Sequence, residues 1–156
     1  MARVVKEYDV RRNEILDVAQ QLFYQKGYEQ TSIQEILSAV GIAKGTFYHY
    51  FDSKETLLAA LVERMSGQVL QLIAPIATDP TLTACQKFEQ VFAQAHQWKF
   101  EHKAVLLQLL GAFYQDENIR LRHNLISFGA AQITPVWAQI IAQGVQEGVF
   151  VTTHPL

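Results

Sequence analysis

The chain has 156 residues, of which 49% are hydrophobic and 18% are charged, and its formal net charge at pH 7 is −2. This balance is typical of a soluble globular protein and excludes wholesale disorder. No apolar run approaches the roughly 18 residues that a membrane-spanning helix needs, and the charged N-terminal residues do not resemble a secretory signal. The single cysteine, Cys85, cannot form an internal disulfide, which suits a reducing compartment. These features favour a soluble cytoplasmic protein.

Apolar residues recur at helical spacing along most of the chain, and no segment shows the alternation that is typical of a strand. The first predicted helix begins with Asp9 as its N-cap and ends at Gly27. Residues 31–34 have the form of a capping box, which predicts a short helix that ends at Gly41. A third short helix is predicted over about residues 44–50.

The rest of the chain continues the helical pattern. A second capping box at residues 52–55 opens a long amphipathic helix, and Pro75 and Pro80 bracket the break that follows it. We expect Asp79 to be the N-cap of the next helix. Two further helices are predicted over about residues 102–114 and 117–147. The fold class is therefore all-α.

Residues 31–54 carry the strongest functional pattern, because they predict two short helices joined by a tight turn at residues 41–43. The apolar residues of this segment are spaced to pack the two helices at a steep angle, which is a helix-turn-helix arrangement. The second helix of such a pair can lie in the major groove of DNA. Its outer face carries the candidate DNA-contacting residues Lys44, Gly45, Thr46, Tyr48 and His49.

These residue types suit contact with DNA. Lys44 supplies a cation and donors for a guanine edge or a phosphate, and Thr46 can donate, accept, or place its methyl group against a thymine methyl. Gly45 has no side chain, so the helix can approach DNA closely. Tyr48 and His49 can bond phosphates while their rings cover sugars.

Residues 31–36 read T-S-I-Q-E-I, and residues 41–55 read G-I-A-K-G-T-F-Y-H-Y-F-D-S-K-E. Together they closely resemble the signature of the TetR/AcrR family of transcriptional regulators, a match that covers about residues 10–60. The resemblance implies a dimeric repressor that releases its operator when a small effector spreads its two recognition helices apart. It also implies that residues 44–46, 48 and 49 face DNA.

Two more residues enter the predicted DNA site beside those on the second helix. Lys54, in the first turn of the following helix, adds a cation beside exposed N–H groups and is a candidate phosphate clamp. The resemblance implies that Thr31 and Lys54 hold backbone phosphates. Ala43 departs from the family pattern, which often has Ser as the N-cap of the recognition helix, and losing a cap typically costs about 1 kcal/mol.

The net charge of the N-terminal third of the chain does not by itself favour binding to nucleic acid. Residues 1–54 contain seven Lys and Arg and seven Asp and Glu, so affinity must come from a few well-placed groups. Arg3 and Lys6 could form an arm along the DNA, although disordered termini are commoner. The alternative hypothesis is a helical small-molecule-binding or interaction protein that does not bind an operator.

The second half of the chain is rich in aromatic residues, most of which we expect in the core. A subset is the candidate lining of a largely apolar effector pocket: Phe88, Phe92, His96, Phe113 and Trp137. No metal site is expected, since His96 and His102 lie six residues apart on different helix faces. No cofactor is expected either, and no Gly-rich phosphate loop, nucleophile elbow or acidic pair suggests an enzyme.

The sequence thus predicts a three-helix DNA-binding head over residues 1–52 and a helical effector-binding and dimerisation domain over residues 53–156. Members of the family usually carry two further helices that build the dimer, and residues 152–156 look like the start of one. We therefore expect these C-terminal helices to be missing here. The predicted partners are a palindromic operator in double-stranded DNA, a second copy of the chain, and a small effector of unknown identity.

Overall fold

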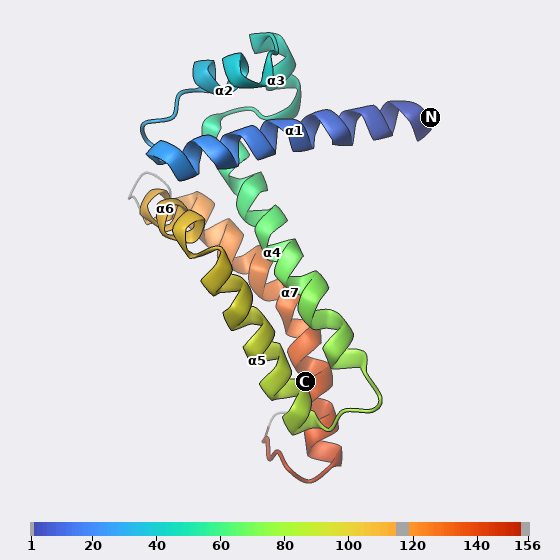
Figure 1. Ribbon diagram of the computed structural model, residues 1–156. Helices are drawn as coiled ribbons and strands as arrows, with labels where there is room; N and C mark the ends of the chain where they lie inside the picture. The colour runs from blue at the N-terminus through green and yellow to red at the C-terminus, as the bar shows by residue number, and fades with distance from the viewer. Residues whose placement is uncertain (1, 115–118, 154–156) are drawn as a thin grey trace. The chain divides into compact units, whose positions relative to one another are not determined.

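The computed structural model describes residues 2–114 and 119–153, without the side chains of residues 2–6, 112, 120 and 121 (Figure 1). The regular elements in these ranges are all helices, so the all-α prediction is confirmed. The helices are α1 (Ala2–Lys26), α2 (Ile33–Val40), α3 (Lys44–Tyr50), α4 (Lys54–Thr78), α5 (Ala84–Glu101), α6 (Lys103–Phe113) and α7 (Ile119–Gln146). The side chains of Arg3 and Lys6, the predicted arm, lie outside the described residues.

The chain divides into two compact units, each built from segments that are distant in the sequence. The first contains Met1–Val62 and Lys103–His123, and the second contains Glu63–His102 and Asn124–Leu156. The predicted division into a DNA-binding head and an effector domain concerns function and stays a prediction.

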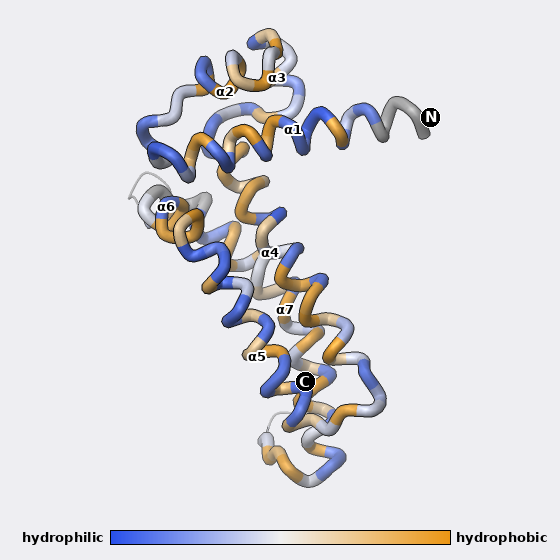
Figure 2. The backbone as a smooth tube through the Cα atoms, viewed as in Figure 1, coloured by the Kyte–Doolittle hydropathy of each residue, from blue (hydrophilic) through white to orange (hydrophobic). Residues whose placement is uncertain are grey.

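Helix α1 begins earlier than the sequence predicted. It starts at Ala2, and Asp9 lies inside it instead of capping it. Polar and apolar residues alternate along the helix (Figure 2), and its buried face includes Ile15, Leu16, Ala19 and Phe23. The predicted end at Gly27 is confirmed, because Gly27 adopts a φ of +88° and its amide donates to the Phe23 carbonyl at 2.9 Å.

Helices α2 and α4 begin with reciprocal caps. At α2, the amide of Glu35 donates to the Ser32 hydroxyl at 3.2 Å, and the Glu35 carboxylate accepts from the Ser32 amide at 2.8 Å. At α4, the Ser53 amide donates to the Thr56 hydroxyl at 3.0 Å, and the Thr56 amide donates to Ser53 Oγ at 3.2 Å. Both boxes begin one residue later than predicted.

Asp79 is not the N-cap of α5, contrary to the prediction. Its carboxylate accepts hydrogen bonds from the hydroxyl (2.6 Å) and the amide (2.8 Å) of Thr81, and these bonds lower the pKa of Asp79. Helix α5 instead begins after Thr83, whose hydroxyl accepts a hydrogen bond from the backbone amide of Gln86 at 3.3 Å. Asp79 therefore closes a turn within the loop.

The core of the second unit joins α4, α5 and α7. Its buried members are Ile73, Ala77, Val91, Val136 and Ile140. Helix α4 continues through Pro75, which the sequence had predicted to mark a break. By length and composition alone, α4 and residues 122–146 of α7 could cross a membrane, a property that apolar core helices share. Each helix contributes two buried residues to this core, Ile73 and Ala77 from α4 and Val136 and Ile140 from α7.

A buried lysine ties the same three helices together. Lys87 of α5 is only 4% exposed, and its ammonium group donates to the Ala77 carbonyl at 2.8 Å and to Gln143 Oε1 at 2.6 Å. The side-chain amide nitrogen of Gln143 donates in turn to the Leu82 carbonyl at 2.8 Å and to Glu147 Oε1 at 2.6 Å. A buried cation is tolerated here because each of its described partners is an oxygen acceptor.

Replacing Lys87 tests this network. Lys87→Met keeps most of the apolar stem but leaves the Ala77 carbonyl and the Gln143 side chain without their donor, so we expect a loss of about 1–3 kcal/mol in the free energy of unfolding. Urea denaturation followed by circular dichroism measures the loss. Lys99→Met, at an exposed position of the same helix, is the matched control, and equal stabilities of the two variants would contradict the prediction.

Candidate nucleic-acid interface

The turn between α2 and α3 depends on a left-handed glycine. Gly41 has a φ of +76°, and its amide and that of Ile42 donate to the Leu37 carbonyl at 2.9 and 3.1 Å. This geometry ends α2 after eight residues and lets the chain reverse before α3. Helix α3 starts after Ala43, which makes no side-chain capping bond, as expected for the alanine that stands at this position.

One face of α3 is buried in the first unit. Phe47 is fully buried and Phe51, the residue after the helix, is nearly so, with their ring centroids 5.8 Å apart. Ile36 and Leu37 of α2 are buried as well. In Figure 1, α2 and α3 lie along one side of α1. The apolar residues of the predicted helix-turn-helix therefore fix how α3 is presented.

The opposite face of α3 is open. Lys44, Gly45, Tyr48 and His49 are exposed, and Thr46 is partly exposed. The Lys44 ammonium lies 5.9 Å from the centroid of the Tyr48 ring. A Cβ atom placed on Gly45 would meet nothing within 4 Å, so packing inside the protein does not require glycine there. This face offers donors, acceptors and aromatic rings on one short helix.

Thr31 does not belong to this face, which corrects the sequence-based assignment. It is 0% exposed, and its hydroxyl donates to the Gly27 carbonyl at 2.8 Å. A buried hydroxyl has no surface with which to hold a phosphate. Its role is to close the loop between α1 and α2, which also explains why the capping box passes to Ser32.

Lys54, the predicted phosphate clamp, is only partly exposed and bonds to carbonyls of the protein, and its contact with a phosphate stays a prediction. Its ammonium group donates to the carbonyls of Tyr28 (2.9 Å) and Thr31 (3.1 Å) and lies 4.1 Å from the centroid of the Tyr28 ring. Tyr28 is buried, and that burial, followed by the nearby charge of Glu55, raises the pKa of its phenol. Lys54 therefore braces the start of α4 against the α1–α2 loop.

An ion pair links the end of α1 to α2. The Lys26 ammonium donates to the Glu35 carboxylate, and this bond, with those from Ser32, lowers the pKa of Glu35 from its ordinary 4.5 to about 2. Glu35 thus serves both the cap of α2 and the contact with α1.

Tyr8 and Arg12 of α1 also contact the C-terminal end of α3, and the sequence analysis did not single them out. Tyr8 lies against the rings of His49 and Tyr50, while the Arg12 guanidinium lies 5.3 Å from the centroid of the Phe51 ring. The missed signal was the helical spacing of Tyr8 with Arg12 and Ile15, because a helix capped at Asp9 leaves Tyr8 outside.

Three of the five predicted effector-pocket residues come together. Phe88, Phe92 and Trp137 have ring centroids 4.8–5.5 Å apart, and Phe92 is 54% exposed. His96 is exposed on the same helix as Phe88. Phe113 belongs to the first unit, where it contacts Tyr114. The assignment of these residues to an effector pocket stays a prediction.

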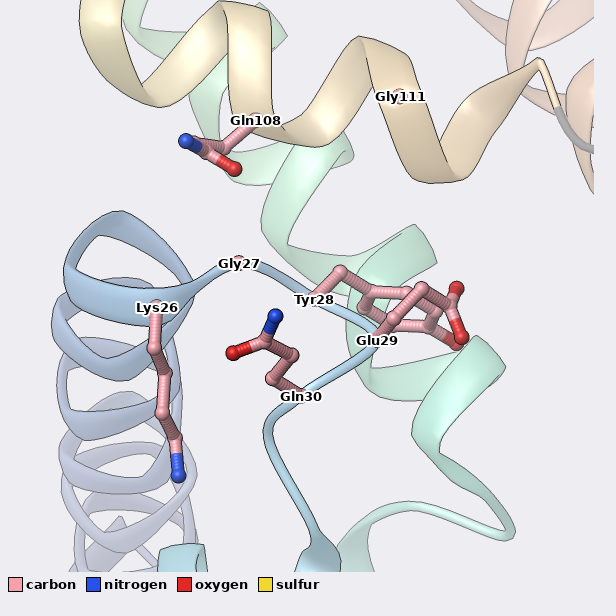
Figure 3. A pocket seen from close by; sticks show the side chains of 7 residues that line it. All are labelled: Lys26, Gly27, Tyr28, Glu29, Gln30, Gln108 and Gly111. Carbon is pink, nitrogen blue, oxygen red and sulfur yellow. The ribbon is translucent and has the colours of Figure 1, made fainter.

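A pocket of about 280 Å³ lies within the first unit, between α6 and the loop after α1. It is lined by Lys26, Gly27, Tyr28, Glu29, Gln30, Gln108 and Gly111 (Figure 3). A Cβ atom on Gly27 would lie 3.2 Å from Gln108 Oε1, so the glycine allows α6 to approach the loop closely.

The geometry defines a helix-turn-helix protein whose second helix has an exposed side, and the comparisons with known proteins agree with this class of fold. Residues 15–61 match the model of the bacterial regulatory proteins of the tetR family. The repressor KstR2 of Rhodococcus jostii is 30% identical over 151 residues, which span 90% of this chain and 68% of that protein. KstR2 of Mycobacterium tuberculosis is 28% identical over 96% of this chain and 74% of its own length.

Solved structures share the fold across most of the chain. A TetR/AcrR regulator from Thermobifida fusca is 26% identical, with a TM-score of 0.69 over 93% of this chain and 75% of that one. The regulator FadR from Bacillus subtilis is 23% identical, with a TM-score of 0.74 over 90% and 74%. The chain belongs to the tetR family of bacterial regulatory proteins and is a DNA-binding transcriptional regulator.

The brace made by Lys54 predicts a stability effect. Lys54→Met removes the donor of two partly buried carbonyls and the cation beside Tyr28, so we expect the first unit to lose about 1–3 kcal/mol of unfolding free energy. Lys44→Met, at an exposed position, should change it by less than about 0.5 kcal/mol. Thermal and urea unfolding compare the two, and a Lys54→Met variant as stable as Lys44→Met would refute the brace.

The low pKa of Glu35 predicts a pH dependence. A carboxylate whose pKa is lower in the folded state stabilises that state above its unfolded pKa and loses the effect as pH falls through its folded pKa. The melting temperature of wild type should therefore exceed that of Glu35→Gln at pH 7, and the difference should shrink between about pH 4.5 and 2. A difference that stays constant over this range would contradict the ion-pair account.

Proposed function

We propose that the chain represses transcription by inserting the open face of α3 into the major groove of an operator. The observation that carries this proposal is the division of α3 into two faces. Phe47 is fully buried, whereas Lys44, Gly45, Tyr48 and His49 are exposed. Such a division is what a recognition helix requires, because its apolar face fixes its orientation and its polar face contacts the DNA.

The groups on α3 divide between reading bases and holding the backbone. Lys44 and Thr46, in the first turn, offer the donors and acceptors that distinguish base edges in the major groove. Tyr48 and His49, one turn later, suit contacts with phosphate and sugar. Because residues 1–54 carry no net charge, these few groups supply most of the affinity that the head contributes.

The regulator acts on DNA as a homodimer in this proposal, since members of the family act as dimers. Two-fold symmetry in the protein requires a palindromic operator, with the recognition helices in successive major grooves about 34–36 Å apart. The proposed place of action is the bacterial cytoplasm, where a transcriptional regulator reaches its operator.

A small, largely apolar molecule is the proposed effector. The rings of Phe88, Phe92 and Trp137 form an apolar cluster in the second unit, where ring faces suit an aliphatic or aromatic ligand. The structure of FadR was determined in complex with stearoyl-CoA, so a regulator with this fold can bind a ligand that carries a long acyl chain.

Base preference tests the assignment of α3. The chain should enrich a palindromic duplex from a randomised library, and binding to that duplex should weaken as salt increases. The double substitution Lys44→Ala/Thr46→Val should change the enriched sequence and cost about 1–3 kcal/mol of affinity for the wild-type duplex. Fluorescence polarisation of labelled duplexes measures both effects.

Lys99→Ala, on the exposed surface of α5, is the matched control and should keep both the preference and the affinity. An unchanged preference in the double variant would exclude base reading by this face. Absence of any salt-sensitive binding by wild type would favour the alternative, a helical protein that binds small molecules without an operator.

A further inference from the structure

We infer that Tyr8 is a positioning residue for DNA recognition, which holds the C-terminal end of α3 so that His49 faces the DNA. This inference rests on the proposed function, because it assumes that α3 is the recognition helix. It assigns a role in that function to the N-terminal part of α1, which lies before the segment that matches the family model at residues 15–61.

Three aromatic rings from α1 and α3 form one cluster in the first unit. The Tyr8 ring lies 4.6 Å from that of Tyr50, at an interplanar angle of 39°, and 5.7 Å from that of His49, at 81°. The rings of His49 and Tyr50 lie 5.1 Å apart. These separations fall within the range of favourable aromatic pairs, and the edge-to-face angle at His49 restricts how its ring can turn.

The position of Tyr8 follows from the helical repeat of α1. Tyr8, Arg12, Ile15 and Ala19 fall at intervals of three and four residues, so they share one helix face. Ile15 and Ala19 are fully buried. Arg12 and Tyr8 continue this face toward the N-terminus, where they meet Phe51 and Tyr50.

Helix α3 benefits from such a support more than a longer helix would. It has seven residues, its N-cap Ala43 makes no side-chain bond, and it ends at Phe51 in an extended conformation. So short a helix is unstable by itself and takes its geometry from packing. Phe47 anchors its middle, whereas His49 is exposed and makes its described ring contacts with Tyr8 and Tyr50.

Tyr8 is 37% exposed, so its hydroxyl could instead contact a phosphate directly. The two roles make different demands on the side chain. A brace requires the ring and not the hydroxyl, whereas a phosphate contact requires the hydroxyl. Tyr8→Phe therefore separates them, and Tyr24→Ala, at an exposed tyrosine of the same helix, controls for the loss of a surface ring.

The first measurement needs no DNA. Amide hydrogen exchange at residues 44–50 should be faster in Tyr8→Ala than in wild type, and unchanged in Tyr8→Phe and Tyr24→Ala. Circular dichroism shows whether each variant keeps its helices. Exchange rates in α3 that do not respond to Tyr8→Ala would overturn the inference, whether or not the chain binds DNA.

The second measurement uses the duplex that the wild-type chain enriches from a randomised library. Tyr8→Ala should bind it about two- to tenfold more weakly, the range that one aromatic contact commands, while Tyr8→Phe and Tyr24→Ala bind like wild type. In a chain that already carries His49→Ala, the further substitution Tyr8→Ala should cause little additional loss of affinity, because Tyr8 acts through His49.

The outcomes are distinguishable from failure of the proposed function. If wild type enriches no duplex, the DNA-binding proposal fails, while the exchange experiment still decides whether Tyr8 supports α3. If wild type binds but Tyr8→Phe is as weak as Tyr8→Ala, the hydroxyl matters and the brace is refuted. Additive losses in Tyr8→Ala and His49→Ala would equally refute it.

Discussion

The left-handed turn at Gly41 is the constraint on which the rest of the head depends. Its φ of +76° ends α2 and sends the chain into α3 at the angle that buries Phe47. Any residue with a Cβ is strained there, even though the space around it is open. Phe47 is fully buried, whereas Lys44, Tyr48 and His49 of the same short helix are exposed. The turn at this one glycine therefore fixes the start of α3, the helix whose exposed side chains we propose as the DNA contacts.

Polar groups that resemble DNA contacts in the sequence are used instead to hold this geometry. The Thr31 hydroxyl and the Lys54 ammonium both bond to carbonyls of the α1–α2 loop, at Gly27, Tyr28 and Thr31. The consequence is a division of labour within the family signature. Its exposed residues on α3 are the proposed operator contacts, whereas Thr31 and Lys54 hold the α1–α2 loop beside that helix.

The sequence predicted the features that depend on neighbouring residues. The helix-turn-helix, the end of α1 at Gly27 and the unfilled cap at Ala43 all follow from glycines, side-chain types and a repeat of three to four residues. It failed where the partner is distant or where two hydroxyls compete. The destination of the Lys54 ammonium depends on carbonyls 23 and 26 residues away, and Thr31 is buried while Ser32 caps. The cluster around Tyr8 was missed because Asp9 resembled a cap.

The central claim is that the exposed face of α3 is the surface that meets DNA. Nuclear magnetic resonance tests it most directly, by following backbone amide shifts while the chain is titrated with the duplex it enriches from a randomised library. The account predicts that the largest changes fall at residues 43–50 and that they decrease as salt is added. Changes that leave α3 unaffected and concentrate elsewhere on the chain would contradict it.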